Sequence, residues 1–195
     1  MTIVYWIRHA QSDSTISDPV LRPLTEKGIR DRALITDYLR GKDIRAAFSS
    51  PYKRAVDTIA DFTEKAGLEI RLLDGFREHE TVSDAYPDAD YFPFIQKYWA
   101  DKHYKVPGDE SFAELQSRNI RALEQVLLSC EGQNVIIGTH GMALASVLQY
   151  YDERFGYPQF LAMVARKPWI VKMDFAQLTN CGITCIDPFA PVPEP

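Results

Sequence analysis

Short apolar runs alternate along the chain with stretches in which apolar residues recur every three to four positions. The runs at 2–7 and 134–139 are rich in β-branched and aromatic residues and lack polar alternation, which is typical of strands buried on both faces. The runs that predict β-strands are residues 2–7, 45–49, 69–73, 134–139, 169–175 and 182–186. The last two lie close enough in the chain to form a hairpin.

The stretches between these strands carry the start and stop signals of helices. Thr25 is a favourable N-cap, and Ser111 with Glu114 three residues later forms a capping box. The predicted helices run from Thr25 to Gly41, from Ser50 and Pro51 to Gly67, from Ser111 to Gly132, and over 142–151. This alternation predicts a single α/β domain over residues 1–195, built as a three-layer α/β/α sandwich around a mostly parallel mixed sheet.

Residues 79–108 interrupt the alternation. The segment contains Pro87, Pro93 and Pro107 among many aromatic residues. We interpret it as a small, partly helical insertion over one end of the sheet, which acts as a lid or selects the substrate.

Charge narrows the range of partners. The chain has 195 residues and a formal net charge of -5, from 22 Lys and Arg against 27 Asp and Glu. Binding to a polyanion needs many basic side chains that displace counterions, so nucleic acid is not expected as a partner. A few well-placed cations must bind any anionic ligand. The first apolar run lacks a preceding basic segment and is interrupted by Arg8, so we expect no signal peptide, no membrane partner and a cytoplasmic location.

The cysteines give no sign of a disulfide framework. Cys130, Cys181 and Cys185 are odd in number and contain no Cys-x-x-Cys pair. Cys181 and Cys185 lie four residues apart in a strand-like run, so both are predicted to be small apolar residues of the core.

Polar side chains suited to catalysis follow four of the predicted strands directly. They are Arg8, His9, Ser50, Arg54, Glu78 and His140. Because ligands of open α/β sheets bind beyond the carboxyl ends of the strands, we expect these side chains to line one site.

Two arginines with two histidines indicate a site for a phosphate group. Guanidinium groups present fixed forks of donors that match phosphate oxygens, and the helix start predicted at Ser50 would add free N–H groups. The arginines disfavour protonated imidazole, so His9 is the candidate nucleophile toward phosphorus. Arg8, Arg54 and a protonated His140 would stabilise the charge of the transferring phosphoryl group.

The proton donor to the departing alcohol has three candidates. Glu78 follows a predicted strand and is preferred, with Asp74 and Glu80 as competitors.

Other chemistries compete for the same residues. Two histidines and a carboxylate could hold zinc or iron, but the sequence has no His-x-His or His-x-x-x-His spacing and places cations beside the histidines. Ser49 and Ser50 lack the Gly-x-Ser-x-Gly surroundings of a serine nucleophile. His79 and His103 are predicted to be structural. No metal and no cofactor is therefore expected.

At these residues the chain resembles the histidine phosphatase superfamily, which has the phosphoglycerate mutase-like fold. Its segments are similar to the family's Arg-His-Gly, Leu-Thr-x-x-Gly, Ser-Ser-Pro-x-x-Arg-Ala, Gly-Gly-Glu-Ser and Ser-His-Gly motifs, in family order. The matching segments are Arg-His-Ala-Gln-Ser at 8–12, Leu-Thr-Glu-Lys-Gly at 24–28, Ser-Ser-Pro-Tyr-Lys-Arg-Ala at 49–55, Gly-Asp-Glu-Ser at 108–111 and Thr-His-Gly at 139–141.

The resemblance implies a role for each site residue and the absence of a metal. His9 would form a phosphohistidine, Glu78 would act as acid and base, and the phosphate pocket would comprise Arg8, Arg54 and His140. Thr15 stands where many relatives have a phosphate-contacting Asn, which makes it a further candidate for phosphate binding.

The resemblance also implies a class of reaction. Compact relatives of this length are mostly phosphomonoesterases, whereas the mutases are typically longer, so we expect a phosphomonoester hydrolase acting on a small phosphorylated metabolite. A phosphoglycerate mutase-type phosphotransferase is the alternative. A regulatory or binding module with a degraded site is a third possibility, although every expected charged position is filled here. A homodimer is compatible with the sequence.

Overall fold

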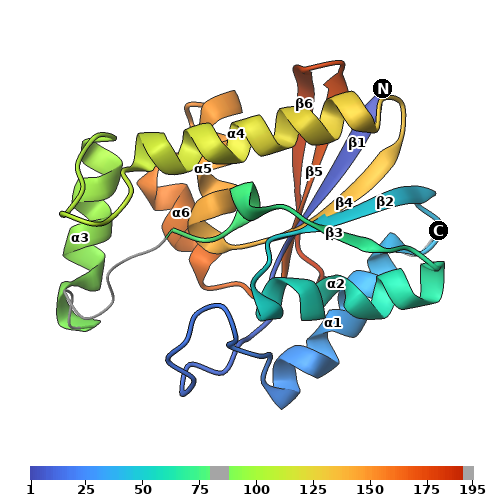
Figure 1. Cartoon of the computed structure of the whole chain (residues 1–195), viewed down its shortest axis with the longest axis horizontal. Coiled ribbons are helices and arrows are strands. Elements are labelled where there is room, and N and C mark those ends of the chain that lie inside the picture. The colour runs from blue at the N-terminus through green and yellow to red at the C-terminus, as the bar shows by residue number, and fades with distance from the viewer. Residues whose placement is uncertain (80–87, 191–195) are drawn as a thin grey trace.

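The computed structural model describes residues 1–79 and 88–190 of the chain, and within them the strands form one sheet in the order β3-β2-β4-β1-β5-β6 (Figure 1). The strands are β1 (Thr2–Arg8), β2 (Ile44–Ser49), β3 (Ile70–Leu72), β4 (Asn134–Thr139), β5 (Trp169–Ala176) and β6 (Thr179–Ile186). β1, β2, β3 and β4 are parallel, and β5 runs antiparallel to both of its neighbours. The mostly parallel mixed sheet and the C-terminal hairpin are thus confirmed.

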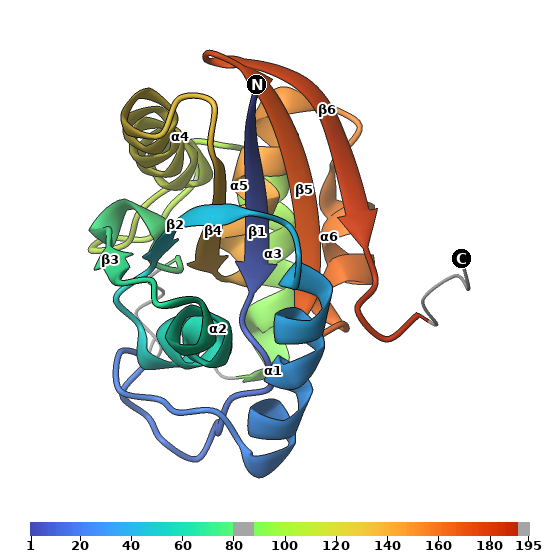
Figure 2. The same ribbon diagram turned by 90° about the vertical axis from the view of Figure 1, so that its right-hand side faces the viewer.

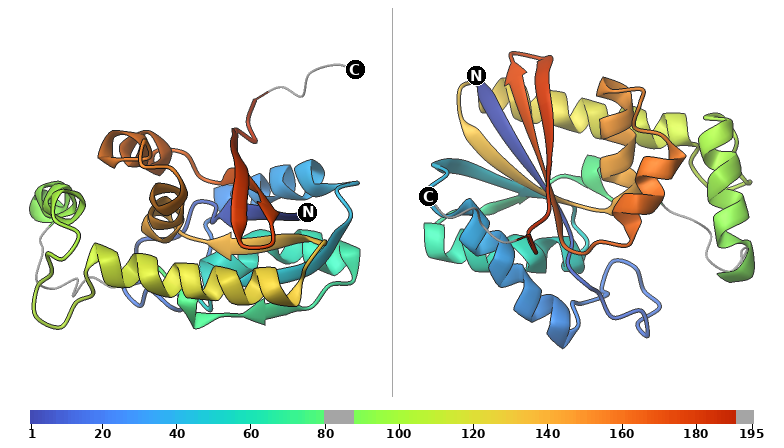
Figure 3. Two further views of the ribbon diagram at one scale, coloured as in Figure 1. Left: turned by 90° about the horizontal axis from the view of Figure 1, so that it is seen from above. Right: turned by 180° about the vertical axis from the view of Figure 1, so that it is seen from behind.

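Helices cover both faces of this sheet (Figures 2 and 3). They are α1 (Glu26–Leu39), α2 (Lys53–Ala66), the short 3-10 helix η1 (Asp74–Phe76), α3 (Asp88–Ala100), α4 (Phe112–Ser129), α5 (Gly141–Tyr151) and α6 (Tyr157–Val164). α1 and α2 pack in one hydrophobic cluster with the residues of β1 that point to their side, and α4, α5 and α6 pack in another on the opposite side. The three-layer α/β/α sandwich expected from the sequence is confirmed.

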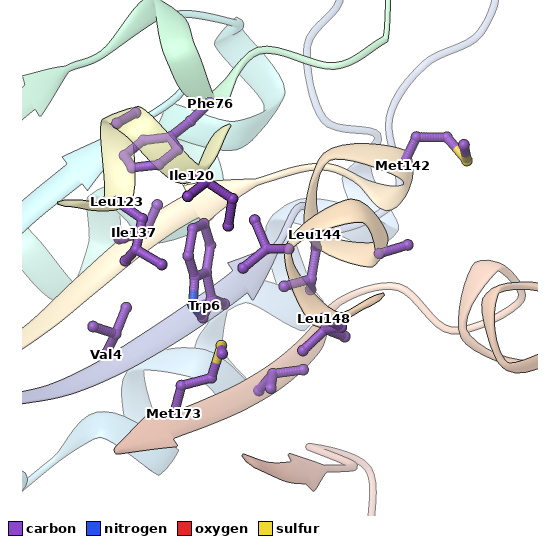
Figure 4. Close-up of a cluster of buried hydrophobic side chains, with 14 of the residues drawn as sticks. Val4, Trp6, Phe76, Ile120, Leu123, Ile137, Met142, Leu144, Leu148 and Met173 are labelled. Atoms are coloured by element: carbon purple, nitrogen blue, oxygen red, sulfur yellow. The ribbon is translucent and has the colours of Figure 1, made fainter. Parts of the chain in front are cut away.

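The larger hydrophobic cluster holds β1, the strand that ends at Arg8, just before His9. Trp6 of β1 is fully buried and meets Phe76 edge-to-face, with 5.4 Å between the ring centroids. Figure 4 shows Trp6 between Ile137 of β4, Leu144 of α5 and Met173 of β5. Because each of these partners belongs to a different element, the position of β1, and with it Arg8 and His9, is set by the core.

Helix α1 packs closely on the loop that follows His9. Thr25 caps it by accepting a hydrogen bond from the N–H of Gly28. A Cβ at Gly28 would lie 2.2 Å from the carbonyl oxygen of Gln11, so only glycine permits this approach.

Helix α2 begins later than predicted. Its N-cap is Tyr52, whereas the sequence placed the start at Ser50 and Pro51. The hydroxyl of Ser50 accepts from the N–H of Tyr52 in the preceding turn and contacts His140, so it is not a helix cap. The prediction that a helix starting at Ser50 supplies free N–H groups is therefore wrong.

The prediction for two of the cysteines is also wrong. Cys130 is buried, but Cys181 and Cys185 are exposed free thiols. Both lie on β6, the last strand in the sheet order, which pairs with β5. A strand in that position has less of the molecule over its faces than a central one, and alternation in a sequence does not reveal where a strand lies in a sheet.

Part of the insertion predicted at 79–108 is helical. Phe94, Ile95 and Tyr98 of α3 are buried in the larger hydrophobic cluster. Residues 80–87 lie outside the described residues, so the role of the segment as a lid or selector stays a prediction.

Candidate active site

The two histidines lie next to each other because their strands are neighbours. Arg8 pairs with Thr139 in the parallel register of β1 and β4, so His9 and His140 leave the sheet side by side. The N–H of His9 donates to the carbonyl of Thr139 over 3.0 Å, and the two imidazole centroids are 5.3 Å apart. The structure therefore brings together the residues that the sequence placed at one sheet edge.

His9 is held as a neutral imidazole with a defined tautomer. Its Nδ1 lies 2.7 Å from the carbonyl oxygen of Ala10, which can only accept, so Nδ1 carries the hydrogen. Burial, with the positive charges of Arg54 and Arg8, holds the pKa of His9 well below its usual value. Its unprotonated Nε2 accepts from Nε of Arg54 over 3.3 Å. The ring thus presents a lone pair beside a cation.

His140 packs against the ring of His9 and is fully buried. Its Nε2 is 2.7 Å from the hydroxyl of Ser50. Burial and the charge of Arg54 hold the pKa of His140 well below its usual value. The protonated form of His140 considered from the sequence is therefore disfavoured, because the ring is removed from water and lies close to the charge of Arg54.

The two predicted arginines are held by backbone carbonyl groups. Nη1 of Arg54 donates to the carbonyl of Pro19. Nη1 of Arg8 donates to the carbonyls of Met163, Val164 and Arg166, at 2.8, 3.0 and 2.8 Å. These carbonyls belong to the end of α6 and the turn after it, so α6, which the sequence analysis did not predict, orients Arg8.

Glu78 lies at the first turn of α5. Its Oε1 accepts from the N–H groups of His79 and Ala143, both over 3.0 Å, and its Oε2 accepts from Met142 over 3.2 Å. Helix N-termini offer such unpaired N–H donors to carboxylates. A Cβ on Gly141 would be 3.4 Å from Nη2 of Arg8 and 3.6 Å from Oε2 of Glu78, so Gly141 lies close to both groups.

The competitors of Glu78 differ in placement. Asp74 is exposed and pairs with Arg77 over 2.8 Å. It is absent from the lining of the pocket. Glu80 lies outside the described residues. Glu78 is thus the described carboxylate that reaches the site.

These groups surround a pocket of about 210 Å³. Its lining consists of Arg8, His9, Ser12, Arg22, Arg54, Glu78, Gly141, Met142, Phe160, Val164 and Lys167. Sequence reasoning missed Arg22 and Lys167 as site residues, because both come from irregular segments with no local signal. Ser12 lies within the Arg-His motif, and that position could have revealed it.

Thr15 is not part of this lining. It is exposed, and its hydroxyl donates to the carboxylate of Asp13 over 2.7 Å. Within the described loop its side chain therefore orders the turn that precedes α1.

Two further observations concern metals and membranes. Among residues 1–79 and 88–190, no three His, Cys, Asp or Glu side chains are grouped as a metal site would require. In the same part of the chain, no helix combines the length and apolar character needed to cross a membrane.

The motifs and this geometry agree with a family comparison. Residues 4–163 match the model of the histidine phosphatase superfamily (branch 1), and the chain belongs to this family. A probable phosphoglycerate mutase (GpmB) of Yersinia pestis is 28% identical over 159 residues, which cover 76% of this chain and 74% of that protein.

Solved structures share the fold at lower identity. YhfR of Bacillus stearothermophilus is 21% identical with a TM-score of 0.74, over 92% of this chain and 94% of that one. A mycobacterial glucosyl-3-phosphoglycerate phosphatase, solved with inorganic phosphate, is 18% identical with a TM-score of 0.69, over 94% and 95%. A phosphoserine phosphatase of Entamoeba histolytica, solved with 3-phosphoglyceric acid, is 16% identical with a TM-score of 0.72, over 97% and 100%. The phosphoglycerate mutase-like fold is thereby established.

Proposed function

We propose that the protein is a phosphomonoester hydrolase that works through a phosphohistidine at His9 and acts on a small phosphorylated metabolite. Membership of the histidine phosphatase superfamily supports a phosphatase or a mutase. The observation that carries the proposal is the unprotonated Nε2 of His9, 3.3 Å from the guanidinium of Arg54. A nucleophile beside a fixed cation suits attack on an anionic phosphoryl group.

The first half-reaction forms the phosphohistidine. Nε2 of His9 attacks phosphorus, the bond between phosphorus and the ester oxygen breaks, and the alcohol leaves with a proton from Glu78. Arg8 and Arg54 hold the phosphoryl oxygens and offset the charge on them. The ring of His140 packs edge-on against the ring of His9 and helps to hold it in place.

The second half-reaction releases the phosphate. A water molecule attacks phosphorus as the carboxylate of Glu78 takes its proton, and the P–N bond breaks to return neutral His9. In a mutase an alcohol of the bound acid takes the place of water. We favour hydrolysis because solved structures that share this fold include phosphatases for glucosyl-3-phosphoglycerate and for phosphoserine.

Turnover of p-nitrophenyl phosphate by the wild type and by His9→Ala tests this mechanism. His9→Ala should lose at least about 10³-fold in kcat, because it removes the nucleophile. His103→Ala is the matched control, since His103 is exposed. Unchanged turnover in His9→Ala would exclude the mechanism. EDTA should leave wild-type activity intact, and loss on chelation would favour a metal.

The intermediate separates hydrolysis from transfer. A trapped phosphoenzyme should be labile in acid and stable in base, as expected of a phosphohistidine. Release of its phosphoryl group to water as inorganic phosphate would support a hydrolase. Transfer to added phosphoglycerate would instead support the mutase.

A further inference from the structure

The pocket carries more positive charge than a phosphate group needs. Besides Arg8 and Arg54, the guanidinium of Arg22 and the ammonium of Lys167 line it, and Glu78 is the one carboxylate in the described lining. His9 and His140 add no charge, because their pKa values are held well below the usual range. A phosphate dianion therefore leaves positive charge unmatched.

Arg22 is fixed at one side of the pocket. It is half-buried, and its Nε donates to the carbonyl of Ile16 over 2.9 Å. Within residues 1–79 and 88–190 it forms no ion pair, although Asp13 and Asp18 lie in the same loop. Those carboxylates instead accept hydrogen bonds from the loop itself, Asp13 from Thr15 and Asp18 from Val20. Hydrogen bonds from Thr15, and with them the charge of Arg22, lower the pKa of Asp13, but the guanidinium of Arg22 lines the pocket without a direct carboxylate partner among the described residues.

Lys167 faces the same space from the segment between α6 and β5. It is half-buried, and in the described part of the chain it has neither a hydrogen bond nor an ion pair. Its neighbour Arg166 forms an ion pair with the carboxylate of Asp187 at 3.1 Å. Burial and the charges of Arg8 and Arg54 lower the pKa of Lys167, and Glu78 opposes them. A half-buried ammonium among arginines is costly unless an anion compensates it.

We infer that Arg22 and Lys167 form a second anion subsite, which selects phosphomonoesters bearing a carboxylate near the phosphate. The inference rests on the proposed function and names its substrate class, a small phosphorylated carboxylic acid. Among the described lining residues, the four cations exceed the charge of a phosphate dianion whether Glu78 is ionised or, as the proton donor, neutral. A second anionic group on the substrate is therefore favoured, and a carboxylate is a small one. The pocket of about 210 Å³ is smaller than typical sites for drug-sized ligands, which suits a metabolite of a few carbons.

A matched pair of substrates isolates the carboxylate. O-Phosphoserine and O-phosphoethanolamine both carry an ammonium and differ in the carboxylate group. We expect the wild type to prefer phosphoserine by at least about 10-fold in kcat/KM, because a charge-assisted hydrogen bond contributes on this scale. Equal kcat/KM values for the two esters would overturn the subsite.

Substitutions of Arg22 and Lys167 test whether these residues cause the preference for phosphoserine. Lys167→Met keeps the apolar stem and removes the charge, and Arg22→Gln keeps a donor. Each should lower the phosphoserine-to-phosphoethanolamine ratio about 10-fold, mainly through KM for phosphoserine, and Lys167→Arg should restore it. Lys65→Met, at an exposed position of α2, is the control and keeps the ratio. Equal losses on both esters in Lys167→Met would place Lys167 in the phosphate pocket instead.

Two further experiments separate a subsite for a second phosphate, and a failure of the proposed function, from a failure of the carboxylate subsite. If fructose 1,6-bisphosphate is preferred over fructose 6-phosphate, and this preference alone depends on Lys167, the subsite binds a second phosphate and the carboxylate assignment is wrong. If the wild type hydrolyses no ester, the proposed function fails. Calorimetric titration of His9→Ala with phosphoserine and phosphoethanolamine then still tests the subsite, and equal affinities would overturn it.

Discussion

The carboxylate of Glu78 accepts a hydrogen bond of 3.0 Å from the backbone N–H of Ala143, in the first turn of α5. The helix that follows His140 therefore holds the candidate acid in place. In Glu78→Gln the amide oxygen can still accept from the N–H groups of His79 and Ala143. The side chain cannot transfer a proton, however, and its NH2 group loses the hydrogen bond from the N–H of Met142. We expect losses of about 10²-fold or more on alkyl phosphates and smaller losses on aryl phosphates, whose leaving groups need less protonation.

Comparing kcat for phosphoserine and p-nitrophenyl phosphate checks this prediction. Asp74→Asn is the matched control, because Asp74 is exposed and its partner is Arg77. Equal losses on both esters in Glu78→Gln would mean that another group donates the proton.

His79 is predicted to position Glu78. Its N–H donates to Glu78, while its ring Nε2 donates to the carbonyl of Glu110 over 3.0 Å and lies 3.3 Å from the buried carboxylate of Asp109. His79→Leu removes the ring contacts, so the peptide that carries Glu78 loses its anchor. We expect about 10-fold lower kcat on phosphoserine with little change in KM, and about 1–3 kcal/mol lower free energy of unfolding.

The selectivity of the loss identifies a positioning role. If His79 acts through Glu78, the loss on phosphoserine should exceed that on p-nitrophenyl phosphate, as in Glu78→Gln. A change confined to the free energy of unfolding, measured by urea titration, would reduce His79 to a structural residue.

Arg8→Lys should uncouple α6 from the pocket. The guanidinium donates to three carbonyls at the end of α6 and in the turn after it, and an ammonium cannot reproduce that fixed fork. We expect about 10²-fold lower kcat/KM and faster amide hydrogen exchange in residues 157–166. Arg154→Lys is the control, since Arg154 pairs with Asp152 at the surface. Loss of activity with unchanged exchange would show that α6 does not depend on Arg8.

Stability should fall as the solution becomes acidic, because two histidines are buried in neutral form. Burial and the charge of Arg54 hold the pKa values of His9 and His140 well below 6.5 in the folded state, whereas the unfolded chain titrates near 6.5. Below that pH the unfolded state binds more protons, so the free energy of unfolding decreases by up to about 1.4 kcal/mol per pH unit for each histidine. The loss continues until the lower folded pKa is reached.

Urea unfolding at pH 7.5, 6.5 and 5.5 measures this slope. His140→Gln should reduce it by about one histidine's share, since glutamine does not titrate. A slope identical to that of the wild type would show that His140 is not buried in neutral form.

Sequence reasoning predicted the parts of the site that depend on strand order. His9 and His140 follow strands whose apolar runs predict central positions, and the parallel register places them together. Arg22 and Lys167 could not be found in this way, because their positions depend on the paths of two loops. Helix α6 was missed since its sequence, Tyr-Pro-Gln-Phe-Leu-Ala-Met-Val, is apolar on nearly every side and shows no helical period.

The errors have physical causes in tertiary contacts. Ser50 followed by Pro51 has the local features of a helix start, but the Ser50 hydroxyl is taken by His140, ninety residues away. Cys181 and Cys185 fit a strand, and their burial depends on where β6 lies in the sheet. Local patterns therefore predicted most of the elements and not all of their surroundings.

The groups proposed to react and the groups proposed to choose the substrate come from different kinds of structure. His9 and His140 extend from the ends of neighbouring central strands, whereas Arg22 and Lys167 are carried by connecting segments. Connecting segments tolerate replacement better than core strands do. Relatives could therefore exchange one metabolite for another during evolution by changing two loops, and a designer could redirect this scaffold in the same way while leaving the nucleophile where it is.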